Sequence, residues 1–295
     1  MRLISSEGDT LTLPPEHRFP IGKYLRVTEI LRAEHPALMQ EAPRASWEDL
    51  ALVHDPAYLA AVRTGTLDPA AVRRLGFPWS DALVSRSRRS TGGTLTALAW
   101  AFAHGASGHM AGGTHHAFRD RGEGFCVFND LAVAIMVARR DHGIRRVAVV
   151  DLDVHQGNGT AAIFAGDPEV LTISLHGARN YPFRKEQSSL DIDLPDNCED
   201  PAYLHALSEA LERVPEHRPE LILYQAGVDG LAGDRLGRLA LTHEGLKQRD
   251  ARVFALARRL GVPLVVTLGG GYGRDIERTI VAHANVYRGL VEHLG

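Results

Sequence analysis

Four short apolar runs in the last two thirds of the chain constrain its fold more than any other feature. Each run is almost entirely apolar, which is typical of strands covered on both faces, and a helical pattern separates one run from the next. The expected strands span residues 147–150, 170–174, 221–224 and 263–268, and the expected helices span 93–104, 131–140, 201–214 and 242–260, with another helix beginning at Asp55-Pro56. This alternation predicts a three-layer α/β/α fold with a mostly parallel central sheet.

Polar residues and glycines gather where these runs end. They are Asp151, Asp153 and His155 after the first run, Ser174 and His176 at the second, Gln225 and Asp229 after the third, and Gly269-Gly-Gly-Tyr272 after the fourth. The carboxyl ends of the strands in an open α/β sheet share one edge, and ligands bind in the crevice there. The sequence therefore predicts that four strand ends contribute to one site.

Charge, hydropathy and cysteine content narrow the class of protein. With 33 Lys and Arg against 36 Asp and Glu, the formal net charge is −3, which gives no reason to expect a nucleic-acid partner. The chain contains no run of about 18 apolar residues that would predict a membrane span, and its N-terminus lacks the apolar stretch of a secretion signal. Two cysteines without CxxC spacing, Cys126 and Cys198, argue against disulfides and a thiolate zinc site and favour a cytoplasmic location. We expect one domain over residues 1–295 and leave the oligomeric state open.

Asp153, His155 and Asp229 are the candidate metal ligands. Residues two apart at a strand end point the same way, so Asp153 and His155 can hold one ion together. The competing interpretation is that Asp153 caps a loop and His155 packs in the core. The presence of Asp229 at another strand end favours a metal. Two carboxylates and an imidazole suit Zn²⁺, Fe²⁺, Co²⁺ or Mn²⁺.

A second candidate feature is the histidine pair His115-His116, which follows the glycines of residues 112–113. Such a pair could bind metal, lie on the surface by chance, or transfer protons. Adjacent side chains of an extended segment point in opposite directions, so both rarely bind one ion, and we favour proton transfer. A catalytic histidine needs a partner that fixes its tautomer, and Asp151 or Asn158 could supply one.

Two aromatic residues complete the candidate site. Tyr272 follows three glycines, which let the backbone approach a ligand closely, and its phenol could donate to a developing oxyanion. The alternative is a tyrosine on a surface turn. Phe125, in the glycine-rich segment 122–130, could line a narrow apolar channel or belong to the core.

Six segments in this order resemble the zinc-dependent histone deacetylase family, which has the arginase/deacetylase fold. They are residues 112–117, 124–130, 151–160, 174–176, 227–234 and 269–272, and residues 53–58 extend the resemblance. Gln156 and Asn158 are similar to the class IV-like and bacterial branches, because class I members usually carry His and Asp at these two positions. A neutral Asn158 should raise the basicity of His116 less than an aspartate would.

The resemblance implies a role for each matching residue. Asp153, His155 and Asp229 would bind zinc, His115 would pair with Asp151, and His116, the general base and acid, would pair with Asn158. Tyr272 would polarise the acyl carbonyl. Gly124, Phe125 and Gly270 would line the acyl-lysine tunnel, with either Tyr181 or Phe183 as its second wall. Structural potassium is also implied, with an inner site at Asp151, Asp153, His155, Ser174 and Leu175 and an outer site that includes Phe164 and Val170.

The expected activity is hydrolysis of the lysine side-chain amide in acetylated or otherwise acylated proteins or peptides, with release of acetate. Deacetylation of an acetylpolyamine or another small acyl-amine is the first alternative, and removal of longer acyl chains is the second. A ureohydrolase is less favoured because it would need a two-metal site with more carboxylates. A non-catalytic acyl-lysine binding module should lack one of the site residues, and none is missing.

Overall fold

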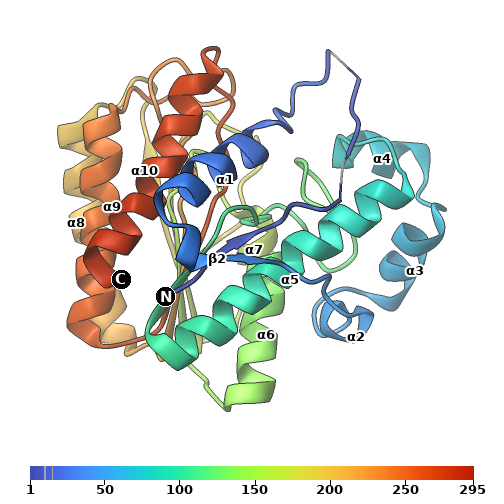
Figure 1. Cartoon of the computed structure of the whole chain (residues 1–295), viewed down its shortest axis with the longest axis horizontal. Helices are drawn as coiled ribbons and strands as arrows, with labels where there is room; N and C mark the ends of the chain where they lie inside the picture. Colours follow the sequence, from blue (N-terminus) through green and yellow to red (C-terminus); the bar gives the residue numbers. More distant parts are fainter. Residues whose placement is uncertain (10, 15) are drawn as a thin grey trace.

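The computed structural model describes residues 1–9, 11–14 and 16–295. Within them, eight strands form one parallel sheet in the order β2-β1-β3-β8-β7-β4-β5-β6. The strands are β1 (Leu3–Ser5), β2 (Met39–Glu41), β3 (Ala106–His109), β4 (Val147–Asp151), β5 (Val170–Gly177), β6 (Leu190–Leu194), β7 (Leu221–Gln225) and β8 (Leu264–Thr267). The helices are α1 (Lys23–Glu34), α2 (Trp47–Leu50), α3 (Pro56–Thr64), α4 (Pro69–Leu75), α5 (Asp81–His104), α6 (Asp130–His142), α7 (Asn158–Ile163), α8 (Asp200–His217), α9 (His243–Leu260) and α10 (Ile276–Leu294), and a 3-10 turn spans Pro36–Leu38. Helices α8, α9 and α10 lie side by side (Figure 1).

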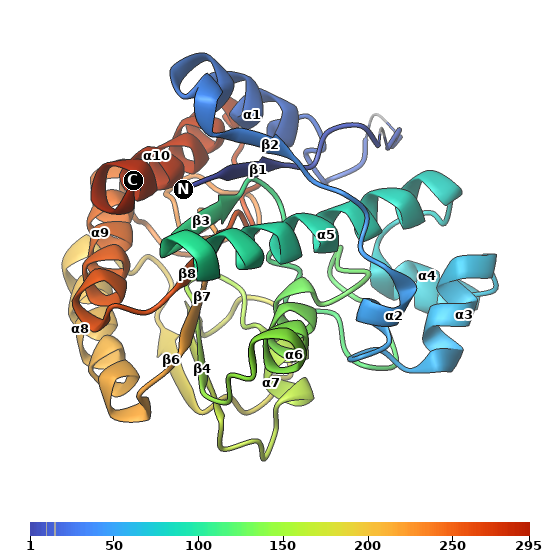
Figure 2. The ribbon, with the colours of Figure 1, turned by 60° about the horizontal axis from the view of Figure 1, so that its bottom comes forward.

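Helices cover both faces of the sheet, which confirms the expected three-layer architecture. Helices α1, α8, α9 and α10 pack on one face, and α5 and α6 lie on the other (Figure 2). Strand β4 shows why this requires a wholly apolar run. Val147 and Val149 belong to the core under α5 and α6, whereas Ala148 and Val150 belong to the core under α8 and α9. Alternate residues of one strand therefore fill two separate cores.

The four strands expected from the sequence are β4, β5, β7 and β8, and they are contiguous in the sheet in the order β8-β7-β4-β5. Strands β1, β2, β3 and β6 were not expected. Their length does not distinguish them, because the expected strands β4, β7 and β8 also have only four or five residues. Their sequences do, since LIS, MQE, ASGH and LDIDL contain no continuous apolar run.

Helix α5 begins twelve residues before the expected start at residue 93, because Ser80 caps it by accepting a hydrogen bond from the Leu83 amide. The glycine pair Gly92-Gly93 suggested a boundary but lies in the middle of the helix. A Cβ atom on Gly92 would lie 2.0 Å from the Pro43 carbonyl oxygen, and one on Gly93 would lie 2.2 Å from His109 Nε2. These glycines therefore permit close packing of the helix and do not end it.

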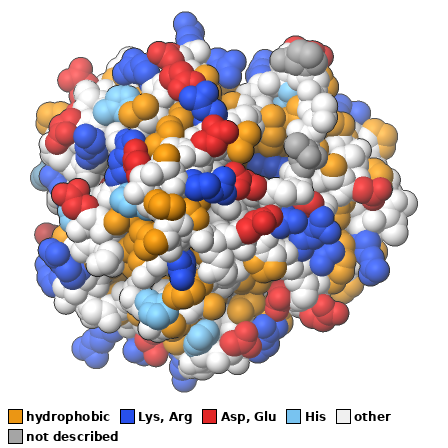
Figure 3. Space-filling view, viewed as in Figure 1, with side chains coloured by type: hydrophobic (Ala, Val, Ile, Leu, Met, Phe, Trp, Pro, Cys, Tyr) orange, Lys and Arg blue, Asp and Glu red, His pale blue; other side chains and the backbone are white. Residues whose placement is uncertain are grey.

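The surface agrees with the balanced composition. Acidic and basic side chains are interspersed over the face that Figure 3 shows. Among the described helices, none is both long enough and apolar enough to cross a membrane.

Candidate active site

Asp153, His155 and Asp229 come together at the carboxyl edge of the sheet. Asp153 and His155 follow β4, and Asp229 follows the neighbouring strand β7. Their candidate donor atoms all lie within 4.8 Å of one another, and all three side chains are buried. Backbone amides hold the carboxylates, because Gly270 N donates to Asp153 (2.7 Å) and Val154 N donates to Asp229 (2.9 Å).

The local structure fits a cation at this place. Burial raises the pKa of Asp229 to about 7, and the Asp153 carboxylate adds to this increase. Burial opposes the charged form of His155, but hydrogen bonds to both carboxylates raise its pKa to about 10. Two carboxylates buried this closely need positive charge, which a divalent cation would supply together with a vacant position for substrate. Asp153, His155 and Asp229 could therefore hold a metal ion.

The adjacent histidines have different partners. His115 Nδ1 lies 2.7 Å from Asp151 Oδ2, and His116 Nδ1 lies 2.6 Å from Asn158 Oδ1. Burial opposes protonation of His115, but the carboxylates of Asp151 and Asp153 raise its pKa to about 9. Burial, with the nearby His115 and His155, lowers the pKa of His116 well below its usual range. Near neutral pH the pair therefore combines a cationic and a neutral imidazole.

Glu123 supports Asn158 and was not anticipated from the sequence. Its buried carboxylate accepts hydrogen bonds from Asn158 Nδ2 (2.7 Å) and from the Tyr181 hydroxyl (2.8 Å). Because the amide nitrogen of Asn158 faces Glu123, its oxygen faces His116. This arrangement requires His116 Nδ1 to carry the proton and leaves Nε2 as the free acceptor. A negative charge thus lies one hydrogen bond beyond the neutral partner of His116.

A buried lysine and a glycine loop hold Tyr272. A Cβ atom on Gly270 would lie 2.0 Å from Asp229 Oδ2, so only glycine lets this loop pass the carboxylates. Lys23, on α1, donates to the carbonyl oxygens of Gly269 and Gly271, both at 3.2 Å, and its Nζ lies 5.1 Å from the centre of the Tyr272 ring. Burial lowers the pKa of Lys23 to about 8. Sequence patterns did not indicate Lys23, because its partners are almost the whole chain away.

An outer cavity of about 380 Å³ leads to these groups, and His116, His155, Phe125, Tyr181 and Tyr272 all line it. Phe125 has a left-handed backbone conformation (φ 67°), which is unusual for a residue with a side chain. Its amide donates to the Leu75 carbonyl (2.9 Å), and its ring centre lies 6.2 Å from that of Tyr272.

The structure distinguishes Tyr181 from Phe183. The Tyr181 ring lies edge-on to His116, with 5.0 Å between ring centres. The Phe183 side chain is 91% exposed, although it also borders the outer cavity. Gly124 lines this cavity and a small adjoining space of about 40 Å³ beside Asp153, whereas Gly270 lines only the small space.

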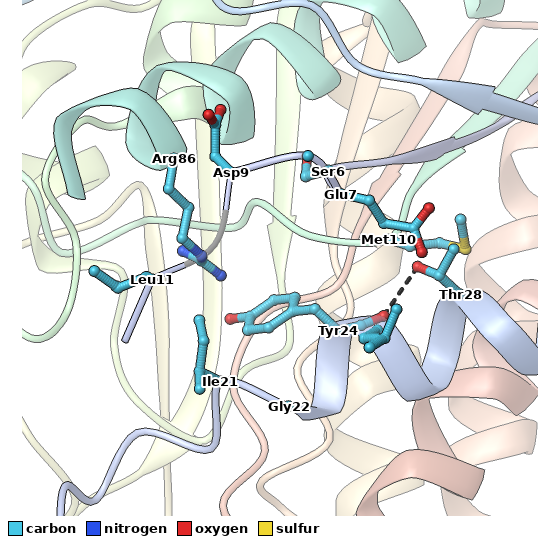
Figure 4. Close-up of a pocket in the computed structure, with 12 residues that line it drawn as sticks. Ser6, Glu7, Asp9, Leu11, Ile21, Gly22, Tyr24, Thr28, Arg86 and Met110 are labelled. Carbon is cyan, nitrogen blue, oxygen red and sulfur yellow. Dashed lines mark hydrogen bonds between the residues drawn. The ribbon is translucent and has the colours of Figure 1, made fainter. Parts of the chain in front are cut away.

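A second cavity of about 310 Å³ lies between α1 and α5 (Figure 4). It shares Tyr24 and Arg86 with the small space beside Asp153. The Arg86 guanidinium lies 4.7 Å from the centre of the Tyr24 ring, and in Figure 4 the two side chains point toward each other. The buried groups of the site therefore border cavities on two sides.

The residues that the resemblance assigned to potassium are all buried. Asp151 and Ser174 are register partners on β4 and β5, so the inner set lies at one place in the sheet. Phe164 ends α7, and Val170 begins β5 at its other end. These positions are compatible with two separate groups of backbone carbonyls.

Comparison with known proteins identifies the family. The family model described as "histone deacetylase domain" matches residues 17–287. The chain belongs to the histone deacetylase family. A relative described as histone deacetylase 2 of Arabidopsis thaliana is 33% identical over 90% of this chain and 72% of its own length. An uncharacterized protein of Picosynechococcus sp. is 42% identical over 94% of this chain and 93% of its own length.

A solved structure shows the same fold. It is described as an HDAC homolog complexed with SAHA, and it matches 99% of this chain and 84% of its own length, with a TM-score of 0.84 and 26% identity. The chain is therefore an amidohydrolase of the deacetylase type with the arginase/deacetylase fold, and its family is metal-dependent, usually on zinc. These matches confirm the family and fold expected from the sequence.

Proposed function

We propose that this deacetylase-family enzyme hydrolyses the side-chain amide of acyl-lysine in proteins or peptides and releases acetate when the acyl group is acetyl. One observation carries the proposal most directly. His116 with a free Nε2, the buried phenol of Tyr272, and Asp153 and His155 of the buried Asp-His-Asp cluster border the same small space. These are the base, the oxyanion donor and the metal ligands that amide hydrolysis needs.

We propose that Asp153, His155 and Asp229 hold Zn²⁺, with Fe²⁺ or Co²⁺ compatible with the same donors. When bound, such an ion polarises the acyl carbonyl and makes a water molecule more acidic. In the protein itself, Gly270 N and Val154 N keep the two carboxylates oriented for this role. Structural potassium at the inner and outer groups of carbonyls remains part of the proposal.

His116 acts as the general base and then as the general acid in this mechanism. Asn158 holds its Nδ1–H, so Nε2 takes a proton from the attacking water. The water oxygen forms the new bond to the acyl carbon, and the carbon–nitrogen bond then breaks. His116 gives its proton to the departing lysine nitrogen, so the products are a carboxylic acid and an amine.

Tyr272 and His115 stabilise negative charge on the carbonyl oxygen. Burial raises the pKa of Tyr272 well above 10, so its hydroxyl stays protonated and can donate a hydrogen bond. His115 contributes a positive charge, with its ring centre 4.1 Å from that of His116. Asp151 fixes the orientation of His115 by accepting from Nδ1.

We assign the two walls of the lysine tunnel to Phe125 and Tyr181. Both border the outer cavity, and Tyr181 contacts His116. Apolar walls suit the aliphatic stem of the substrate lysine, whose charge is absent while it is acylated. The nearly full exposure of Phe183 favours a place at the outer end of the passage.

Replacement of the phenol hydroxyl tests the proposal. With metal content fixed and measured, Tyr272→Phe should lower kcat on an acetyl-lysine peptide by about 10²–10³-fold, the usual cost of one oxyanion donor. Tyr203→Phe, a matched change at a buried tyrosine on α8, should leave kcat unchanged. Full activity of Tyr272→Phe would refute the assignment.

The substrate class is tested in the same assay. Wild-type protein is compared on acetyl-lysine and longer acyl-lysine peptides and on acetylspermidine. Faster hydrolysis of the peptides supports the proposal, whereas faster hydrolysis of acetylspermidine would replace it with a polyamine activity. Metal-loaded protein that binds acyl-lysine but hydrolyses no acyl-amine would instead be a binding module.

A further inference from the structure

Arginines surround the outer cavity that leads to the site. Five of them line it: Arg18, Arg74, Arg179, Arg235 and Arg238. We call these five residues the arginine rim. They come from four separate segments, namely the stretch before α1, the last turn of α4, the loop after β5 and the loop after β7. All five are exposed, so their guanidinium groups are available to a ligand at the cavity mouth.

The positive charge of the rim is largely unbalanced. Among the described residues, no Asp or Glu lines the outer cavity. Asp196 is the carboxylate that meets the rim, and it lies 3.4 Å from Arg179 and 3.0 Å from Arg238. Arg18 and Arg74 form no ion pair with the described residues. Because the whole chain has a formal charge of −3, this concentration of positive charge is local and does not follow from a basic composition.

Hydrogen bonds connect the rim segments to the residues around the proposed tunnel. The Arg74 carbonyl accepts from Gly124 N (3.3 Å), directly before Phe125. Arg235 Nε donates to the Tyr272 carbonyl (3.0 Å). Arg179 precedes Asn180, whose amide nitrogen donates to the Leu236 carbonyl (2.6 Å). The cationic groups therefore start from fixed positions around the path that a substrate must take.

We infer that the arginine rim selects acyl-lysine residues that lie in acidic protein segments, with Asp or Glu beside the acylated lysine. Guanidinium groups bind carboxylates with paired hydrogen bonds, and a one-sign cluster at a cleft mouth raises the association rate of oppositely charged substrates. The same charge disfavours polyamines and lysine-rich segments. This inference rests on the proposed function, since it names the substrate class of the same site.

Three acetyl-lysine peptides that differ only in the flanking residues test it. The flanks are Glu, Gln or Lys, and kcat/KM is measured with the metal-loaded protein at low and at moderate ionic strength. We expect the Glu peptide to exceed the Lys peptide by about 10-fold or more at low salt, because steering by charge changes association by this order. The ratio should fall as salt is added, since about 0.1 M salt screens charges beyond about 10 Å.

Paired variants locate the effect. Arg18→Gln/Arg74→Gln removes two of the three rim arginines that form no ion pair with the described residues. It should lower the Glu-to-Lys ratio by about 3-fold or more, because an exposed charge pair usually contributes up to about 1 kcal/mol. Arg235 is left intact because it supports the Tyr272 loop. Arg258→Gln/Arg259→Gln makes the same charge change in the last turn of α9, close to where β8 begins at the opposite edge of the sheet. This control should keep the wild-type ratio.

Equal kcat/KM for the three peptides, or a preference for the Lys peptide, would overturn the inference. An equal loss of ratio in the α9 control would also overturn it, because the effect would then follow total charge. If no peptide is hydrolysed, the proposed function fails separately. Fluorescence anisotropy of the labelled Glu and Lys peptides then decides the inference, with tighter binding of the Glu peptide supporting it and equal or weaker binding refuting it.

Discussion

The pairs His115–Asp151 and His116–Asn158 are neighbours in the site, but the chemistry of their two imidazoles differs. His115 faces a carboxylate directly, and the pKa of its imidazole rises to about 9. His116 faces an amide, and its pKa falls well below the usual range, with the Glu123 carboxylate one hydrogen bond further away. Burial disfavours the charged form of both rings, so the partner and the neighbouring charges decide the difference.

The comparison shows how two identical side chains can take separate roles. A cationic His115 can stabilise negative charge but cannot accept a proton. A neutral His116 can accept one, and its protonation is disfavoured by the cation beside it. A divalent ion at Asp153, His155 and Asp229 would add positive charge beside both rings and so act to lower the pKa of each.

Removal of each imidazole in turn gives the largest expected difference. His116→Gln should lower kcat by about 10²–10⁴-fold, the usual contribution of a general acid and base. His115→Gln should cost less, about 10–150-fold, which corresponds to the loss of one charged hydrogen bond of about 1.5–3 kcal/mol. Single-turnover rates with equal metal content would measure both. A larger loss for His115→Gln would reverse the two roles.

The parts of this site that could be predicted from the sequence share one property. Asp151, Asp153, Asp229 and Tyr272 follow runs that are almost entirely apolar and therefore indicate buried strands, and parallel strands end at one edge. The location of the site thus follows from local patterns once the sheet is inferred.

Other residues could not be predicted because their roles depend on distant partners. In the sequence, Lys23 is an ordinary lysine at the start of a helix. Its role becomes visible only through its hydrogen bond to the Gly269 carbonyl, which lies far away in the chain. Glu123 lies in a glycine-rich turn without periodicity, and its partner Asn158 is 35 residues away. Whether Tyr181 or Phe183 faces His116 depends on the turn between them, and both aromatic types fit the pattern equally well.

Exchange of charge between Asn158 and Glu123 should make the second pair resemble the first. In Asn158→Asp/Glu123→Gln, the carboxylate of residue 158 faces His116, and the amide of residue 123 forms a hydrogen bond to that carboxylate. The pKa of His116 should rise by about 1–3 units, as it does beside an opposite charge. Because His116 must be neutral to accept a proton, the decrease of kcat/KM toward low pH should begin at a higher pH than in the wild type. The pH profile of kcat/KM measures this shift.

The single variant and a remote control sharpen this test. Asn158→Asp alone places two carboxylates in contact, so one of them keeps a proton and the shift should be smaller than in the double variant. Asn285→Asp on α10 makes the same substitution away from the site and should leave the profile in place. An unchanged acid limb in the double variant would show that His116 is not the group that titrates.

Glu123→Gln should give the smallest effect, because Glu123 acts on His116 only through Asn158. Glutamine can still accept the hydrogen bond from Asn158 Nδ2, so the amide keeps its orientation while the negative charge is lost. We expect kcat to fall by about 2–10-fold, less than a direct partner of a metal-site residue usually costs. Without this charge the pKa of His116 decreases, so the acid limb of the pH profile should move to lower pH.

Glu123→Leu also removes the hydrogen-bond acceptor, so Asn158 loses its fixed orientation and kcat should fall further. If Glu123→Gln lowers kcat as much as Glu123→Leu and leaves the acid limb unmoved, Glu123 is a packing residue and the carboxylate has no influence on the base.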